Sequence, residues 1–491
     1  MYIDLDTFEK DIITEENVII GSGAGGATTS FELAKKGKKS IILEGGPFPS
    51  STPERVGSSI SKLYKNNGAT PMLSSNGGPV IGYGQGSCVG GSTFINAGYF
   101  SSTPEWVFEE WCKKNRTEID FKTYKAYSDE IRSEISISKE KLTSRDKDSK
   151  KLLDGANKLN WKIERCERFL KNCNRNNMCP VGCPSESKQS MNVTYLKELI
   201  ANGIDVFFNS EVIKIDVRNS KASSLLMINN NKKLIRVNFK NLFICGGPIS
   251  TPHLVLKNRL ADFKKNHNDF EFHINFRTVA KFKNEMIESN LSTVSIFFMR
   301  EFEKEGALLS AANSDIPYLL ATLSHFNNTL KKDVYNNFNN FALYIYQIKA
   351  SSKGQVKSIF GNQYISYAFE KNDVKQIQKA ILRISELFFM ADAEYLLFPI
   401  QGSKKIKSMI DAKELADSFS VKDLHLISVH GMSSLRSGSE NEQKTDYFGK
   451  LKNFENIFIN DASIVPGNTG ESPQSTVMSF VKHNVKNNVL L

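Results

Sequence analysis

The first fifty residues alternate between short apolar runs and one helix-like stretch. The run Asn-Val-Ile-Ile at 17–20 leads into a loop rich in glycine, and the segment ATTSFELAKKG at 27–37 follows it. A second apolar run at 40–43 ends at Glu44. Short apolar runs bounded by glycine and polar residues indicate buried strands. The pattern therefore predicts a βαβ unit.

Further strand-like runs lie far from this unit in the sequence. Four of them have the same character and lie at 204–208, 211–217, 241–245 and 456–460. If these runs share a sheet with the βαβ unit, the domain is discontinuous.

The region of roughly 266–425 has a different pattern. Short apolar runs such as 342–348 and 363–368 alternate along it, which suggests an antiparallel sheet, and a helix-like stretch follows at 373–390. We expect an α/β (α+β) protein in which a discontinuous Rossmann-like domain carries an inserted domain built on an antiparallel sheet with helices.

Composition and charge narrow the class of protein. The chain has 491 residues, of which 40% are hydrophobic and 24% are charged, as in a globular protein of two domains. The net charge of +11 is interpreted as a lysine-rich surface, because no nucleic-acid-binding signature accompanies it. No run approaches the roughly 20 apolar residues of a membrane span, and the N-terminus does not resemble a signal peptide. We expect a cytoplasmic protein with no membrane span and no nucleic-acid partner.

The cysteines give no sign of a disulfide framework. There are seven of them, an odd number scattered along a long chain, which favours reduced thiols. Only Cys173, Cys179 and Cys183 cluster. Their spacing is not CxxC, no histidine lies nearby, and three thiols leave a structural zinc one ligand short. We therefore expect no metal.

The glycine loop at 21–26 has the GxGxxG pattern. The glycines at its three fixed positions permit a tight turn, close approach of the backbone to a pyrophosphate, and close packing of helix on strand. Glu44 lies 23 residues beyond Gly21, where an acid can bind the ribose hydroxyls. The loop predicts dinucleotide binding and does not by itself distinguish FAD from a nicotinamide cofactor.

Two further segments point to FAD. The run Glu-Gly-Gly-Pro at 44–47 and the glycine-rich run at 84–98 resemble two signatures of the glucose-methanol-choline (GMC) oxidoreductase family, whose members hold FAD. The likeness continues through 188–213, 244–252 and 456–466. It implies cofactor contacts from the following residues: Gly21, Gly23, Ala24, Gly25, Gly26, Glu44, Gly90, Gly91, Ser92, Asn96, Val212, Gly246, Asp461, Ala462 and Pro473.

The resemblance also implies domain bounds and the mode of FAD binding. The FAD-binding domain is expected from 1–110, 190–265 and 430–491, with a connecting or cap region at 111–189 and a substrate-binding domain at 266–429. Some family members attach FAD through a histidine just before the asparagine of the glycine-rich run. Ile95 stands there in this chain, so we expect non-covalent FAD.

His430 is the candidate catalytic base. Its segment, 428–438, resembles the family's catalytic-histidine motif. This implies oxidation of the CH-OH group of an alcohol to an aldehyde or ketone, with a hydride passing to flavin N5 while the imidazole accepts the hydroxyl proton. The electron acceptor is oxygen or another carrier, and the sequence does not choose between an oxidase and a dehydrogenase. The particular alcohol also stays open.

The chain departs from the family pattern in two places. Ser433-Ser434 replaces the usual Gly-Thr pair, and Ser472 replaces a histidine or asparagine just before a proline. Serine can donate a hydrogen bond to a substrate oxygen but cannot act as a base at neutral pH. We rank Ser472 above Glu471 as the second catalytic residue, because a carboxylate would oppose negative charge on the substrate oxygen.

These departures leave two alternative functions open. One is a lyase or a light-driven enzyme on the same scaffold, and the other is a flavin-binding protein without turnover.

Overall fold

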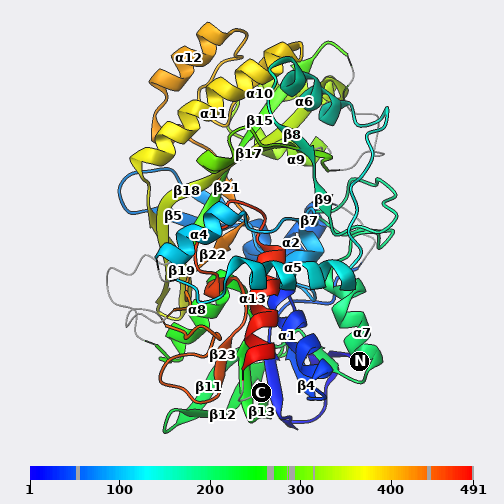
Figure 1. Ribbon diagram of the computed structural model, residues 1–491, viewed down its shortest axis with the longest axis vertical. Coiled ribbons are helices and arrows are strands. Elements are labelled where there is room, and N and C mark those ends of the chain that lie inside the picture. The colour runs from blue at the N-terminus through cyan, green and yellow to red at the C-terminus, as the bar shows by residue number, and fades with distance from the viewer. Residues whose placement is uncertain are drawn as a thin grey trace.

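The computed structural model describes residues 1–50, 56–114, 116–261, 270–284, 286, 294–312, 316–438 and 444–488. Figure 1 shows two lobes, with both chain ends in the lower one. The lower lobe holds the first helix, α1 (Ala24–Lys35), and the last, α13 (Gln474–Asn487). The upper lobe carries the long helix α11 (Lys371–Met390).

A six-stranded parallel sheet forms the centre of the lower lobe. Its strand order is β1-β10-β4-β3-β14-β23, and every pairing is parallel. The strands are β1 (Tyr2–Asp4), β3 (Asn17–Ile20), β4 (Ser40–Leu43), β10 (Asp205–Phe208), β14 (Asn241–Ile244) and β23 (Ile457–Ile459). With α1 between β3 and β4, the predicted βαβ unit and the discontinuous Rossmann-like sheet are confirmed. The N-terminal strand β1 is an addition that its short, mixed sequence did not predict.

A second sheet of four strands extends the lower lobe. It has the order β11-β12-β13-β2, and its strands are β11 (Glu211–Arg218), β12 (Lys221–Ile228), β13 (Leu234–Asn238) and β2 (Ile12–Thr14). The run at 211–217 is thus a strand, but it lies in this sheet rather than in the parallel one. It pairs with β12 as an antiparallel neighbour directly after it in sequence.

The upper lobe is built on a large sheet in which most neighbours are antiparallel. Two long strands dominate it, β15 (Phe270–Phe282) and β18 (Phe341–Ile359), which pair along most of their lengths. The predicted runs at 342–348 and 363–368 lie within β18 and β19 (Asn362–Ala368). The remaining strands are β5 (Thr70–Ser74), β6 (Ile81–Tyr83), β8 (Ile163–Arg165), β16 (Phe297–Met299), β17 (Ala307–Ala311), β20 (Ala393–Leu397), β21 (Leu426–Ser428) and β22 (Gly431–Met432).

Segments from outside 266–429 enter this sheet. Strand β5 pairs with β19, β6 pairs with β21, and β8 pairs with β16. The exact domain bounds stay a prediction. The other helices are α2 (Val56–Leu63), α3 (Ser92–Ile95), α4 (Glu105–Lys113), α5 (Phe121–Glu134), α6 (Lys147–Lys158), α7 (Tyr195–Ala201), α8 (Gly247–Lys257), α9 (Ile316–Thr322), α10 (Asn328–Asn336) and α12 (Met409–Ser418). The short strands β7 (Tyr99–Phe100) and β9 (Glu167–Arg168) pair with each other.

Helix α11 covers the upper sheet because one of its faces is apolar. Ile377, Ile381, Ile384 and Phe388 recur at helical spacing and are fully buried in the upper core. Burying a side chain of this size contributes about 1.5–3 kcal/mol. The stretch predicted as a helix at 373–390 is therefore confirmed, and packing of this face holds it on the sheet.

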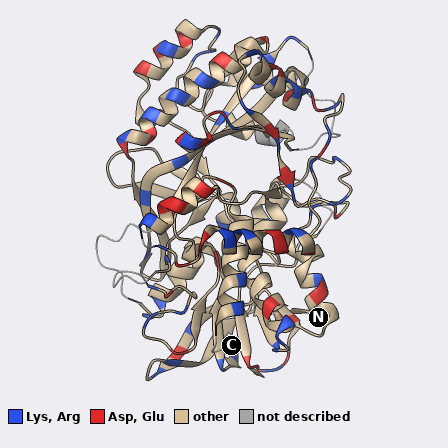
Figure 2. Cartoon of the chain, in the orientation of Figure 1, with Lys and Arg blue, Asp and Glu red and all other residues tan. Residues whose placement is uncertain are grey.

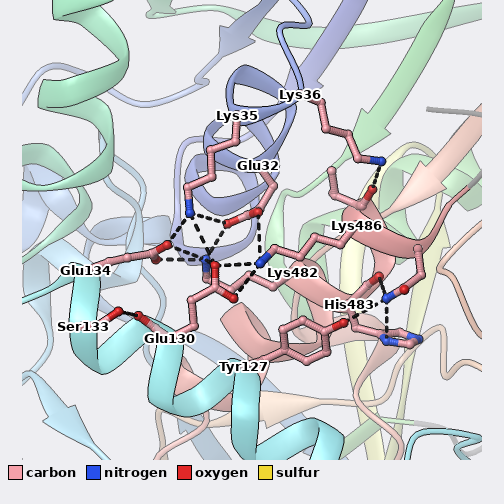
Figure 3. Close-up of polar contacts among 12 residues, drawn as sticks. Glu32, Lys35, Lys36, Tyr127, Glu130, Ser133, Glu134, Lys482, His483 and Lys486 are labelled. Carbon is pink, nitrogen blue, oxygen red and sulfur yellow. Dashed lines mark hydrogen bonds and ion pairs between the residues drawn. The ribbon is translucent and has the colours of Figure 1, made fainter.

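Three helices of the lower lobe meet through a cluster of charges whose centre is buried (Figure 3). The Lys482 side chain on α13 is fully buried and its ammonium contacts Glu32 of α1. It also lies 3.2 Å from Glu130 and 2.9 Å from Glu134, both on α5. Lys35 and Lys486 complete the cluster. The charges of the three carboxylates and the three ammonium groups cancel. Through these ion pairs the cluster joins the C-terminal helix to the first helix of the nucleotide-binding fold.

Positive and negative residues are mixed along the chain in Figure 2. Lys and Arg lie among Asp and Glu on both lobes, and α11 and α12 carry both signs. Among the described helices, none is both long and apolar enough to cross a membrane.

Candidate active site

The glycine loop lies between β3 and the uncapped N-terminus of α1. Gly21 has a φ of +101°, and a Cβ there would lie 2.4 Å from the carbonyl oxygen of Cys245, which directly follows β14. Gly23 is the N-cap of α1 and no side chain caps the helix, which goes on with Ala24, Gly25 and Gly26. Uncapped amides at a helix start provide donors and a partial positive charge for an anion.

Glu44 follows β4 and lies beside this loop. One carboxylate oxygen accepts hydrogen bonds from the Ser22 backbone N–H at 3.0 Å and from its hydroxyl at 2.6 Å. The other accepts from the Gly46 N–H at 3.0 Å. Burial raises the pKa of Glu44, although these bonds oppose the shift. The acid is thus fixed at the carboxyl end of the sheet, where the ribose is expected.

The second glycine-rich run lies directly against the first loop. The Gly90 N–H donates to the Ser22 hydroxyl at 2.9 Å, and a Cβ at Gly91 would lie 2.9 Å from the Gly23 Cα. Ser92 then begins α3. Asn96 donates from its amide to the Gln474 side chain at 2.7 Å. The run therefore connects the loop at 21–26 to the start of α13.

The remaining predicted cofactor segments lie around the same edge of the sheet. Asp461 accepts hydrogen bonds from the Gly247 N–H at 2.8 Å and the Thr251 hydroxyl at 2.5 Å. Gly246 accepts from the Gln85 side chain at 3.1 Å, and Ala462 accepts from the Ser433 N–H at 3.0 Å. Val212 is buried in the lower core, and Pro473 precedes α13.

His430 lies between β21 and β22 and faces a second histidine that the sequence did not point out. The Nδ1 atoms of His430 and His273 are 3.0 Å apart, and the His273 N–H donates to the His430 carbonyl at 3.1 Å. His273, on β15, is fully buried, whereas His430 is half-buried. Burial lowers the pKa of His430 to about 4. Burial also lowers the pKa of His273, and the charge of His430 adds to that effect.

Only one hydrogen can lie between the two Nδ1 atoms, so one ring donates and the other accepts. If His430 donates, its Nε2 keeps a lone pair and can accept a proton. His273 would then carry its own hydrogen on Nε2, a buried atom that has no hydrogen-bond partner among the described residues. A single sequence gave no signal for this pair, because nothing local relates residues 273 and 430.

Ser472 lies in a segment that is anchored on the beginning of β15. Asn468 donates from its N–H to Glu271 and from its side chain to the Phe272 carbonyl, both at 2.7 Å. Strand β22 pairs with the same two β15 residues. The structure therefore brings the segments of Ser472 and His430 to one strand end. Ser472 itself is buried, and its role beside the substrate stays a prediction.

Glu471, the alternative to Ser472, has another partner. Its carboxylate pairs with Arg300, which follows β16. Burial raises the pKa of Glu471, and the charge of Arg300 lowers it. Because the guanidinium compensates this acid, Glu471 is placed as part of an ion pair rather than as a free base.

A groove of about 300 Å³ borders the same strand end. Its lining includes Trp106, Lys349, Glu271 and Asn468. It carries both signs of charge, and His430 is not among the residues that line it. We assign it no role in the chemistry.

Comparison with known proteins identifies the family. The model of the N-terminal part of the GMC oxidoreductases matches residues 18–271, and that of the C-terminal part matches residues 351–480. The chain belongs to the GMC oxidoreductase family, and it is therefore an FAD flavoprotein with a Rossmann-like domain.

The relatives span nearly the whole chain. An uncharacterized GMC-type oxidoreductase of Sinorhizobium fredii is 26% identical over 94% of this chain and 92% of its own length. A long-chain-alcohol oxidase of Arabidopsis thaliana is 24% identical over 94% of this chain and 66% of its own length.

Two solved structures share the fold. Pyridoxine 4-oxidase from Mesorbium loti has a TM-score of 0.75 at 12% identity and covers 97% of this chain and 99% of its own. Formate oxidase of Aspergillus oryzae has a TM-score of 0.76 at 13% identity, covering 97% and 98%. The predicted fold, a Rossmann-like FAD-binding domain with an inserted substrate domain, is confirmed. The sheet of the substrate domain, expected to be antiparallel, is mixed, since two of its pairings are parallel.

The residues present fit an FAD. The uncapped start of α1 offers amides for the pyrophosphate, and Glu44 is fixed where it can bind a ribose. Gly23 and Gly91 lie so close that a side chain at Gly91 would collide with the loop. The fit concerns phosphate and ribose contacts, and the contacts of the individual predicted residues with FAD remain a prediction.

Proposed function

We propose that this protein oxidises the CH-OH group of an alcohol, with His430 as the general base. Bound FAD supplies the two-electron acceptor. The observation that carries the proposal is the His430–His273 pair, with Nδ1 atoms 3.0 Å apart. In the tautomer in which His430 donates to His273, the His430 Nε2 accepts the hydroxyl proton as the substrate carbon is oxidised. The product is an aldehyde or a ketone.

Burial supports His430 as a base because it keeps the imidazole neutral. With a pKa lowered to about 4, the ring has a free lone pair throughout the neutral range. A low pKa also makes it a weak base, so the geometry of proton transfer has to contribute more than its driving force. His273 supplies that geometry by holding the ring from behind.

We propose that Ser472 orients the substrate oxygen with one hydrogen bond. Its support is its place before Pro473 and the anchoring of its segment on β15. Ser472→Ala should lower turnover by about tenfold, which is the loss of roughly one hydrogen bond. Ser475→Ala serves as the control, since that hydroxyl already donates to the Ser101 carbonyl. Unchanged kinetics in Ser472→Ala would remove it from the site.

The direct test is anaerobic mixing with alcohols while the flavin absorbance is followed. The long-chain-alcohol oxidases among the relatives make long aliphatic alcohols the first class to try, followed by sterols, sugars and amino sugars. Bleaching by one class and loss of bleaching in His430→Ala are expected. Turnover without bleaching would favour a lyase, and failure of every class would favour a binding protein.

The flavin is proposed to be non-covalent because Ile95 stands where covalent members have histidine. Ile95 is buried on α3, and an aliphatic side chain offers no nucleophile. After acid precipitation the yellow colour should remain in the supernatant. Yellow colour in the washed pellet would contradict this.

We also propose a cytoplasmic location. The seven cysteines are all free, as is usual in a reducing compartment. Fractionation of the native host should place the protein with cytoplasmic markers, and secretion would overturn the proposal.

A further inference from the structure

Three thiols of the connecting region line one small cavity. Cys173, Cys179 and Cys183 lie in the loop after β9, and all three contribute to the cavity wall. Cys179 is buried, while Cys173 and Cys183 are half-buried. The chemistry proposed above uses none of them.

Each of the three sulfurs accepts an N–H hydrogen bond. The Arg175 backbone N–H donates to the Cys173 Sγ at 3.4 Å, and the Lys188 backbone N–H donates to the Cys183 Sγ at 3.3 Å. The Arg168 guanidinium donates to the Cys179 Sγ at 3.3 Å. Hydrogen bonds of this kind stabilise negative charge on sulfur and tune metal–thiolate sites.

Positive charge is also buried at this place. The Lys188 ammonium is fully enclosed and donates to three neutral carbonyl oxygens, those of Phe94, Asn96 and Cys179. Neutral dipoles alone compensate a buried ammonium poorly. An anionic group bound by the thiols would complete the compensation.

The distances between the three sulfurs limit the kind of metal site that they can form. Within the described parts of the chain, three potential ligand atoms of Cys, His, Asp or Glu lie within 4.8 Å of one another only at Glu32, Glu130 and Glu134. The three sulfurs are therefore too widely spaced for one ion, and zinc would also lack a fourth ligand. In an iron–sulfur cluster each protein-ligated iron takes one thiolate while sulfides bridge the irons, so three thiolates can hold three irons of one cluster.

We propose that Cys173, Cys179 and Cys183 bind an iron–sulfur cluster that has three cysteine ligands. This differs from the sequence-based expectation of no metal, which considered only a single ion. Cys173 and Cys183 are half-buried residues, so one side of the cluster would lie near solvent.

The site is connected to the flavin side of the protein. Lys188 joins Cys179 to Asn96, and Arg168 donates both to Cys179 and to the Ala97 carbonyl. Asn96 and Ala97 belong to the glycine-rich run predicted to contact FAD. The cluster is thus placed to pass electrons from the active site to the surface, which makes the enzyme a dehydrogenase.

This role of the cluster in electron transfer rests on the proposed alcohol oxidation. Oxidation of one CH-OH group to a carbonyl releases two electrons and two protons. The cluster takes one electron at a time and passes each to a one-electron carrier outside the protein. Two molecules of carrier are reduced for each alcohol, and the two protons leave to water.

The experiment is to purify the full chain without oxygen from iron-replete cells and to measure iron, acid-labile sulfide and the electron paramagnetic resonance spectrum. We expect about three to four irons and a similar number of sulfides per chain, with a signal from the cluster in its oxidised or its reduced state. Cys179→Ser should lose iron and signal while keeping its flavin. Cys112→Ser, which changes an exposed cysteine elsewhere, should keep both.

Turnover is a second measurement, independent of the iron and sulfide analysis. With ferricyanide as acceptor, Cys179→Ser should turn over at least about tenfold more slowly, although alcohol still bleaches its flavin without oxygen. Absence of bleaching in the unmodified protein would count against alcohol oxidation and leave the metal analysis intact. An iron-free and sulfide-free protein after anaerobic purification and reconstitution, zinc in place of iron, or a disulfide between two of the thiols would overturn the cluster.

Discussion

His273 lies directly behind His430, with the Nδ1 atoms of the two rings 3.0 Å apart and the rings nearly perpendicular at 82°. The same two residues are joined by a backbone hydrogen bond of 3.1 Å. The candidate base is therefore fixed by its neighbour on β15 through both backbone and side chain. We propose His273 as a positioning residue, since it would act on the substrate only through His430.

Removing the polar atoms of His273 should lower turnover. In His273→Leu the Nδ1 hydrogen of His430 loses its acceptor, so the ring can turn or change tautomer. We expect kcat to fall by about a hundredfold with little change in KM, the lower end of what a positioned acid or base contributes. Stopped-flow and steady-state kinetics measure both values.

Two companion variants separate positioning from a general loss of structure. His273→Gln retains a side-chain oxygen that can accept from His430, and it should recover part of kcat. His325→Leu changes a half-buried histidine elsewhere in the upper lobe, which stacks on His425, and it should leave kcat unchanged. Equal losses in His273→Leu and His273→Gln would contradict the positioning role.

The dependence of activity on pH follows from the pKa of His430. A general base works when it is neutral, so kcat/KM should be level through the neutral range and fall only as the pH approaches about 4. An unperturbed histidine would instead lose activity near pH 6.5. Initial rates across buffers of constant ionic strength test this.

Stability has to be followed in the same experiment. Because the folded pKa of His430 lies below the unfolded value, the unfolded chain binds more protons between the two values, and stability falls as the pH drops through that window. Samples returned to neutral pH should regain full activity. A reversible loss of activity near pH 6.5 would contradict a neutral, low-pKa base.

Local pattern predicted the nucleotide-binding part of the fold because the information there is local. The strand, glycine loop and helix of residues 17–44 follow one another directly, and steric limits at Gly21 leave few alternatives. For the upper lobe the sequence predicted a sheet but not its strand order. Strands β5 and β6 pair with β19 and β21, and these pairings depend on contacts between residues far apart in the chain.

In the candidate site, too, the residues in local motifs were predicted and the contacts between distant segments were not. His430 stood in a recognisable motif, whereas His273 is one of the inward residues of a buried strand and carries no sequence signal. Cys173, Cys179 and Cys183 were visible as a cluster, but their hydrogen bonds and the buried Lys188 beside them were not. Each missed feature is a contact between separate segments.

Ser433 has a left-handed backbone, which explains the glycine that the family usually has there. Its φ is +66°, and its buried hydroxyl makes no hydrogen bond among the described residues. Glycine adopts this conformation without strain. Ser433→Gly should therefore raise the free energy of unfolding by about 1 kcal/mol, measured by urea denaturation of the flavin-loaded protein.

The neighbouring serine supplies a matched control. Ser434 is also buried but is not among the residues of positive φ. Ser434→Gly should lower the free energy of unfolding by about 0.5–1 kcal/mol, because glycine adds freedom to the unfolded chain. If both variants lost stability to the same degree, backbone strain at Ser433 would be ruled out.

Replacing Lys482 tests how much the charge cluster stabilises the lower lobe. Lys482→Met keeps the approximate length of the side chain but removes the ammonium group that pairs with the carboxylates of Glu32, Glu130 and Glu134. Breaking a buried ion pair in this way costs about 3–5 kcal/mol. We expect the variant to unfold at clearly lower urea concentration and to release its flavin more readily, since α13 and α1 are joined there.

An exposed ion pair on one of the same helices gives the comparison. Lys125 pairs with Asp129 on α5, and both side chains are about half exposed, so Lys125→Met should cost no more than about 1 kcal/mol. Chemical denaturation at low and high salt separates the two sites further, because salt screens the exposed pair much more than the buried cluster. A Lys482→Met variant no less stable than Lys125→Met would show that the neighbouring ammonium groups of Lys35 and Lys486 compensate the acids without it.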